Sequence, residues 1–213
     1  MKKKLLAILA IASVVPVASA ITPLWLRDVQ ISPDGSTIAF TYKGDIYTVP
    51  SRGGSATRLT SMPSYESNPV WSPDGKSIAF ASDRNGNFDI YAVDTAGGQA
   101  RRLTSNSASE IPEAFSPDGK YVLFSASIQD PVESALFPSS RMTELYKVPV
   151  KGGSTVQVLG TPAKMMSYLP DGKRFLYQDV KGFEDEWRKH HTSSVTRDIW
   201  LYDPVKSMHV NLT

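Results

Sequence analysis

The sequence has no cysteine and only three histidines. Without cysteine the chain cannot form disulfides, thiolate metal sites, a cysteine nucleophile or a lipid anchor on a cysteine. It also lacks the Gly-x-Ser-x-Gly segment that presents the nucleophile in α/β-hydrolases. We therefore assign no catalytic residue, no cofactor-binding residue and no metal ligand, and we expect no cofactor.

A long apolar run occurs only at the N-terminus. Lys2 to Lys4 form a positive segment, residues 5–15 are apolar, and Ala18-Ser19-Ala20 is a small-residue cleavage site. This order is typical of a secretory signal peptide, predicted at 1–20, with the mature protein beginning at Ile21. A membrane anchor is the weaker alternative, because the run is shorter than the roughly 20 residues that span a bilayer. We expect export to the periplasm or beyond, with no membrane contact after cleavage.

The charge balance of the mature protein is close to neutral. The whole chain has 23 basic and 21 acidic residues and a pI near 8.7. Three of the lysines belong to the signal segment, so no basic stripe remains for a nucleic-acid partner. Because 41% of the residues are hydrophobic, the chain can build a sizeable core.

One turn sequence recurs four times. Ser-Pro-Asp-Gly occurs at 32–35, 72–75 and 116–119, and Leu-Pro-Asp-Gly at 169–172. The spacing is close to the ~40 to 45 residues of a four-stranded propeller blade, with the last interval lengthened by an insertion. Proline supplies the φ near −65° of a type I turn, aspartate tolerates the next position, and glycine takes the left-handed conformation that closes the hairpin.

The segments after each turn also repeat. In the second copy, alternating residues 77–80 and 89–93 predict two strands, Gly97-Gly98 turns the chain, and residues 101–104 form an outer strand. The apolar residues Ile78, Phe80 and Ile90 and their counterparts are expected in the core. The prediction is an all-β propeller of four-stranded blades, with four blades present as an incomplete ring. The blades are expected at 21–60, 61–104, 105–160 and 161–213; a β-sandwich would not repeat one cassette with identical turns.

This cassette resembles the WD-repeat-like blades of TolB and tricorn propellers, which also precede hydrolase domains in prolyl-oligopeptidase relatives. Three further segments look like bacterial tricorn-like serine peptidases: the opening Pro23-Leu24-Trp25-Leu26-Arg27 and the insertions at 128–134 and 187–200. The resemblance implies downstream PDZ-like and protease domains in the same chain, with a serine nucleophile and a histidine base. It further implies that the blades guide peptide or protein substrates toward that core.

Two long insertions are the candidate binding elements. They run over 125–142 and 178–196, where the second copy has only residues 81–88. Loops between the second and third strands project from one face of a propeller, where binding sites are commonly built. Packing on a neighbouring domain is an equally good interpretation of either insertion. The candidate substrate or interdomain contacts are Trp187, Arg188, His190, His191 and Arg197.

Two motifs favour plain structural roles. Adjacent residues of an extended segment point to opposite sides, so His190 and His191 are more easily read as a polar patch than as joint metal ligands. Residues 83–89 alternate carboxylate and amide oxygens, superficially like a calcium loop. The glycine falls at the fourth position rather than the sixth, so a hairpin turn at Asn85-Gly86 is favoured.

Three functions remain open from the sequence. The leading hypothesis is the propeller portion of an exported tricorn-like serine peptidase. The second is a TolB-like periplasmic scaffold that binds proteins without catalysis, and the third is a complete four-bladed binding module. An incomplete ring would expose the faces of its first and last blades and favour a homo-oligomer, whereas a monodisperse monomer would favour the complete four-bladed module.

Overall fold

The computed structural model describes residues 25–128, 142–180 and 197–213, which contain β-strands and no helix. The strands form four antiparallel sheets of four strands each, and this confirms the predicted all-β propeller architecture. The first sheet contains β1 (Arg27–Ile31), β2 (Thr37–Tyr42), β3 (Asp45–Pro50) and β4 (Thr57–Arg58). The second contains β5 (Glu66–Trp71), β6 (Ser77–Ser82), β7 (Asp89–Asp94) and β8 (Arg101–Arg102). The third contains β9 (Glu110–Phe115), β10 (Tyr121–Ala126), β11 (Glu144–Pro149) and β12 (Val156–Leu159). The fourth contains β13 (Ala163–Tyr168), β14 (Phe175–Asp179), β15 (Ile199–Asp203) and β16 (Met208–Asn211).

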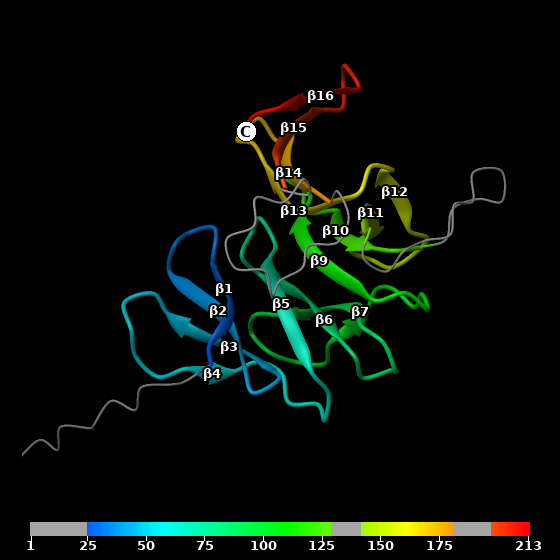
Figure 1. Ribbon diagram of the computed structural model, residues 1–213. Helices are drawn as coiled ribbons and strands as arrows, with labels where there is room; N and C mark the ends of the chain where they lie inside the picture. The colour runs from blue at the N-terminus through cyan, green and yellow to red at the C-terminus, as the bar shows by residue number, and fades with distance from the viewer. Residues whose placement is uncertain (1–24, 129–141, 181–196) are drawn as a thin grey trace, which may run out of the picture.

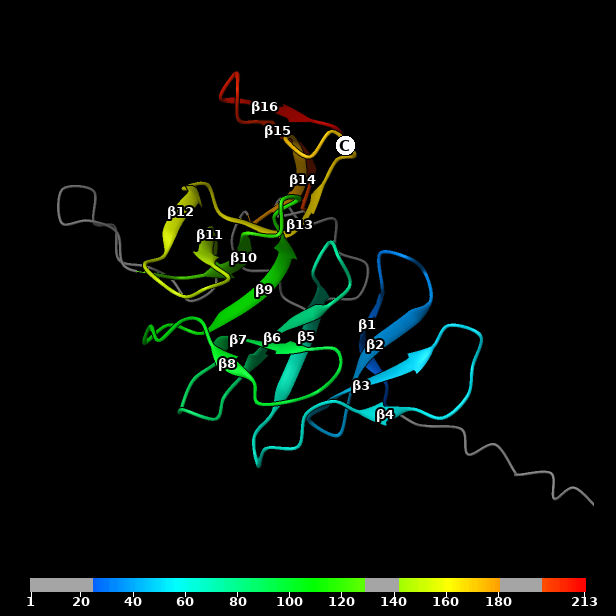
Figure 2. The ribbon, with the colours of Figure 1, turned by 180° about the vertical axis from the view of Figure 1, so that it is seen from behind.

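The four sheets, called blades one to four, follow one another along an arc that does not close into a ring (Figures 1 and 2). Within each blade the strands pair in chain order. The first strands are neighbours around the axis, since β1 contacts β5, β5 contacts β9 and β9 contacts β13. Each blade therefore packs only on the blades before and after it, as a radial repeat requires.

The Pro-Asp-Gly turns have the predicted geometry. In blade one the Gly35 amide donates to the Ser32 carbonyl at 2.9 Å, and Gly35 has a φ of 72°. The Ser32 hydroxyl donates to Asp34 Oδ1 at 2.6 Å and accepts the Thr37 amide at 2.9 Å. Blades two and three repeat these bonds. Each turn thus locks the first hairpin of its blade through its own side chains.

The core lies between the blades. Phe80 and Ile78 pack toward blade one, and Ile90 packs toward blade three, all with no exposed surface, so the predicted core residues are confirmed. An aromatic pair recurs across the second and third strands. Its members are Phe40–Tyr47, Phe80–Tyr91, Phe124–Tyr146 and Phe175–Tyr202. Such cross-strand aromatic pairs stabilise a sheet beyond the area they bury.

The outer strands of blades one and two are shorter than the sequence indicates. Strand β8 ends at Arg102, although residues 101–104 were expected to continue it. The reason lies in Thr104, whose Oγ1 accepts the Ile90 amide at 2.9 Å and takes the place of a backbone ladder bond. Thr60 makes the same contact with the Ile46 amide in blade one.

The first strands each contain a bulge. Their pairing with the second strand shifts register once in every blade. Asp28, Asn68 and Met165 hold left-handed φ values of 51° to 53° at these bulges. The bulges also bridge blades, because Asp28 Oδ2 accepts the Asn68 amide and Glu113 Oε2 accepts the Met166 amide, both at 3.3 Å.

Candidate functional site

The loops between second and third strands all lie at the same end of the blades, which we call the loop face. They comprise residues 43–44, 83–88, 127–143 and 180–198. In the first three blades this loop accepts a hydrogen bond from the first residue of the next blade's inner strand. The bonds are Glu66 N to Gly44 O, Glu110 N to Phe88 O and Ala163 N to Thr143 O, each 2.8 Å. The described residues at the start and end of both long insertions therefore lie at the loop face, whereas the Pro-Asp-Gly turns lie at the opposite end, the turn face.

The predicted contact residues lie in the second insertion. Trp187, Arg188, His190 and His191 fall outside the described residues, and Arg197 is half-buried where β15 is about to begin. Asp179 fixes the base of this insertion. Its Oδ1 accepts the Asp198 amide at 2.8 Å, and its Oδ2 accepts the Trp200 indole N–H at 3.0 Å. The substrate contact proposed for the five residues stays a prediction.

A carboxylate at the start of each third strand is bound by a side chain of the outer strand, thirteen residues later. We call these contacts the clasps. They are Arg58–Asp45 at 2.7 Å, Arg102–Asp89 at 2.7 Å, Gln157–Glu144 at 2.7 Å and Asn211–Asp198 at 3.2 Å. Sequence reasoning missed the clasps. The repeated order of an acid before Ile-Tyr and an arginine before Leu-Thr in blades one and two was the available signal.

Two further carboxylates lie at the loop face between blades. Glu66 and Glu110 begin the inner strands of blades two and three, and both are fully buried. Arg84 pairs with Glu66 and stacks over the Tyr91 ring, 4.3 Å from its centroid. Burial raises the pKa of Glu66, and hydrogen bonding from Thr60 and Arg84 opposes that rise.

A cavity of about 680 Å³ opens beside blade two. Its walls combine Met62, Tyr91 and Ala100 with polar and cationic residues, namely Arg84, Asn85, Gln99, Arg101 and Arg102. Arg84 and Arg102 are already paired with Glu66 and Asp89. The lining contains no nucleophile next to a base, so this cavity can hold a polar segment but offers no acyl-transfer chemistry.

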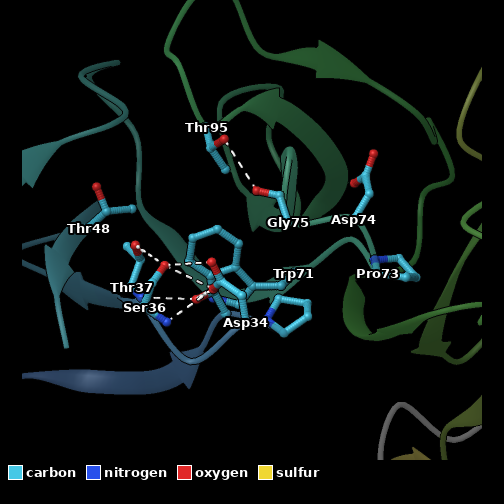
Figure 3. Close-up of a pocket in the computed structure, with 11 residues that line it drawn as sticks. Asp34, Ser36, Thr37, Thr48, Trp71, Pro73, Asp74, Gly75 and Thr95 are labelled. Atoms are coloured by element: carbon cyan, nitrogen blue, oxygen red, sulfur yellow. Dashed lines mark hydrogen bonds between the residues drawn. The ribbon is translucent and has the colours of Figure 1, made fainter.

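A second cleft of about 400 Å³ lies at the turn face between blades one and two (Figure 3). Figure 3 shows Trp71 in its centre, with Asp34 and Ser36 on one side and Asp74 and Gly75 on the other. Hydrogen bonds from Ser32 and Ser36 lower the pKa of Asp34 to about 2, so this carboxylate is ionised and occupied within its own turn. The acidic lining follows from the turn motif.

The oxygen-rich segment 83–89 forms a turn, with the Gly86 amide donating to the Asp83 carbonyl at 2.9 Å. Its polar side chains diverge to separate partners. Asp83 Oδ1 accepts the Tyr65 amide at 2.7 Å, Asn85 donates to the Tyr91 hydroxyl, and Asn87 donates to two carbonyls of the following loop. Among the described residues, no three His, Asp or Glu side chains are grouped closely enough to hold a metal ion.

The part of the chain that the structure describes contains no helix long and apolar enough to cross a membrane.

The fold and the loop face can now be compared with known proteins. The family model for the tricorn protease N-terminal beta propeller domain matches residues 23–213. The chain belongs to this family. A peptidase relative supports the assignment over a shorter stretch, since the uncharacterized peptidase YuxL of Bacillus subtilis (strain 168) is 46% identical over 56 residues. That match covers 24% of the chain and 8% of YuxL.

Solved structures show the same propeller fold as this tricorn-family chain. A putative TolB from Agrobacterium tumefaciens has a TM-score of 0.66 and 27% identity, over 87% of this chain and 64% of its own. The tricorn protease has a TM-score of 0.68 and 24% identity, over 90% of this chain and 18% of its own. TolB from Acinetobacter baumannii has a TM-score of 0.63 and 21% identity, over 88% of this chain and 43% of its own. The chain thus spans only part of the length of the relatives it matches.

Proposed function

We propose that this chain is the propeller portion of an exported tricorn-like serine peptidase, whose blades guide peptide substrates to a catalytic core outside the chain. The observation that carries this proposal is the family match over residues 23–213. The similarity to the peptidase YuxL of Bacillus subtilis supports a peptidase as the parent protein.

The guiding role is assigned to the loop face. Both insertions join second to third strands, and Asp179 holds the base of the second insertion rigidly between β14 and β15. A fixed base positions a long loop relative to the blades, which is the usual way in which a scaffold presents binding residues. Trp187, Arg188, His190, His191 and Arg197 are proposed to contact peptide or a neighbouring domain.

The test uses the full-length protein. A fluorophosphonate probe should label a serine, and the protein should hydrolyse peptides. Replacing Trp187 and His190 together by alanine should lower kcat/KM on long peptides about tenfold, the loss of one good contact, and leave short peptides unaffected. Lys151→Ala, at an exposed position on the turn face, is the control. Equal loss on both peptide lengths would contradict guiding, and an unlabelled, inactive protein would contradict the peptidase.

Export is tested separately. N-terminal sequencing of the protein recovered from outside the cytoplasm should begin at Ile21. An intact Met1 on the functional protein would remove export from the proposal.

A second candidate function is a TolB-like scaffold that binds proteins without catalysis. The similarity to the putative TolB of Agrobacterium tumefaciens, at 27% identity, favours it. This candidate predicts no serine labelling together with stable capture of an envelope protein by the full-length chain.

A further inference from the structure

The interfaces between blades one and two and between blades two and three are built on the same plan. In each, a glutamate begins the inner strand of the later blade and is fully buried. It lies beside the threonine that follows the outer strand of the earlier blade. The glutamates are Glu66 and Glu110, and the threonines are Thr60 and Thr104. The clasp of the earlier blade lies beside each glutamate, so each interface brings two carboxylates together.

The first interface balances its charges. Asp45 is paired with Arg58 at 2.7 Å, and Glu66 is paired with Arg84. Arg84 also donates from Nε to the Ser82 hydroxyl at 2.9 Å, which fixes the direction of its side chain. Two carboxylates therefore face two guanidinium groups.

Among the described residues, the second interface has one cation fewer than the first. Arg102 pairs with Asp89 at 2.7 Å, but neither carboxylate oxygen of Glu110 has a hydrogen-bond partner of normal geometry. The register explains the difference. Ser82 lies opposite Glu66 and Arg84 follows two residues later, whereas Ala126 lies opposite Glu110 and the residue two positions later is Ile128. Ile128 packs against the apolar core instead.

The groups around Glu110 leave its charge poorly compensated. Asp89 and Arg102 face it from blade two, together with the Thr104 hydroxyl and the Ile90 amide. On its own blade the nearest acid in register is Glu144, across Ala126, and Tyr146 and Gln157 already donate to that carboxylate. Burial without a paired cation favours the neutral acid, and the neighbouring Asp89 carboxylate adds to this preference. The pKa of Glu110 is raised to about 7, with burial as the largest cause.

We propose that the interface between blades two and three is a pH-sensitive joint, closed by protonated Glu110 and loosened when Glu110 ionises. The unfolded glutamate titrates near 4.5 and the folded one near 7. The stabilisation from Glu110 is therefore complete at low pH and is lost as the pH rises between these values.

The experiment measures local opening in the full-length protein. Hydrogen exchange of residues 110–126, corrected for the intrinsic base-catalysed rate, is compared at about pH 5 and about pH 8. The opening equilibrium of the wild type should rise on the order of 50-fold more than that of Glu110→Gln, as proton linkage for these two pKa values requires. The strands β2 and β3 of blade one serve as the internal reference. If the opening equilibria of the wild type and Glu110→Gln changed with pH in parallel, the proposed pH-sensitive joint would be wrong.

A second variant keeps the test decisive if Glu110→Gln does not fold. Ile128→Arg places a guanidinium where blade two carries Arg84, so it should lower the pKa of Glu110 and flatten the profile of residues 110–126. Ile128→Met, which keeps an apolar side chain of similar volume, should retain the wild-type profile. An Ile128→Arg profile that matches the wild type would equally overturn the proposal.

Discussion

Arg102 donates from Nη2 to Asp89 Oδ2 across 2.7 Å, with the carboxylate fully buried and the guanidinium about one-third exposed. The same clasp in blade one joins Arg58 to an Asp45 side chain that keeps some exposure. Burial of the acid decides how much each arginine contributes, because a buried carboxylate that loses its partner cannot recover its hydration.

Arg102→Ala should therefore destabilise the protein by about 2–3 kcal/mol, toward the low end for breaking a buried pair because the guanidinium is partly exposed. Arg58→Ala should cost less, since the side chains of Arg58 and Asp45 are 47% and 10% exposed, each more than its counterpart in blade two. Urea denaturation of the two variants gives the comparison. Equal losses would show that burial of the acid does not set the strength of the clasp.

The turn glycines lie over the prolines of the preceding blade's turn. A Cβ at Gly172 would meet Pro117 Cβ at 3.3 Å, whereas a Cβ at Gly35 would meet nothing within 4 Å. Both glycines have φ near 70°, so an alanine at either costs about 1–2 kcal/mol of backbone strain. Gly172→Ala should lower the stability more than Gly35→Ala, because Pro117 must also move to make room for the new methyl group. Thermal unfolding of the two variants measures the difference. A smaller effect at Gly172 would contradict close stacking of the turns.

Acid should weaken the Pro-Asp-Gly turns. Hydrogen bonds from Ser32 and Ser36 lower the pKa of Asp34 to about 2, from the 3.8 of an unperturbed aspartate. Stability from this turn is present above about pH 4 and is lost as the pH falls toward 2. Asp34→Asn should show a shallower decline of stability over this range than the wild type. Asp74→Asn should behave alike, since Ser72 lowers the pKa of Asp74 in the same way, and an unchanged decline in both would refute the assignment.

The ends of the arc carry exposed apolar side chains. Val29 and Ile31 on β1 are about 60% exposed, and Val205 beside β16 is 80% exposed. Uncovered blade faces of this kind favour association, so the mature form of this 213-residue chain should sediment as oligomers that dissociate on dilution. Ile31→Glu should reduce the association without lowering the melting temperature. A monodisperse wild-type monomer would contradict it.

The sequence predicts the fold because the turns carry their own local chemistry. Ser32, Asp34 and Gly35 act within one hairpin, and their recurrence gives the blade order directly. The inner-strand bulges could not be predicted, because Asp28 and Met165 share a left-handed backbone but no side-chain chemistry. Packing against the neighbouring blade imposes that conformation.

The lengths of the insertions direct attention to the loop face, but they do not reveal the charges at this face. A clasp pairs residues thirteen positions apart. Glu66 is paired with Arg84, whereas Glu110 has no paired cation in the part of the chain that the structure describes, and the sequence alone does not reveal this difference. The difference arises from a single residue, Ile128 in place of Arg84, and the register of two sheets is needed to recognise it.

The clasps have a consequence for how such a ring can change in length. Every clasp closes between the third and fourth strands of one blade, so a duplicated or deleted blade carries both members of its pair with it. Duplication of the DNA that encodes one blade therefore leaves no clasp residue of the new blade without its partner. The interfaces between an old and a new blade are the places at which later substitutions must restore complementary packing and charge.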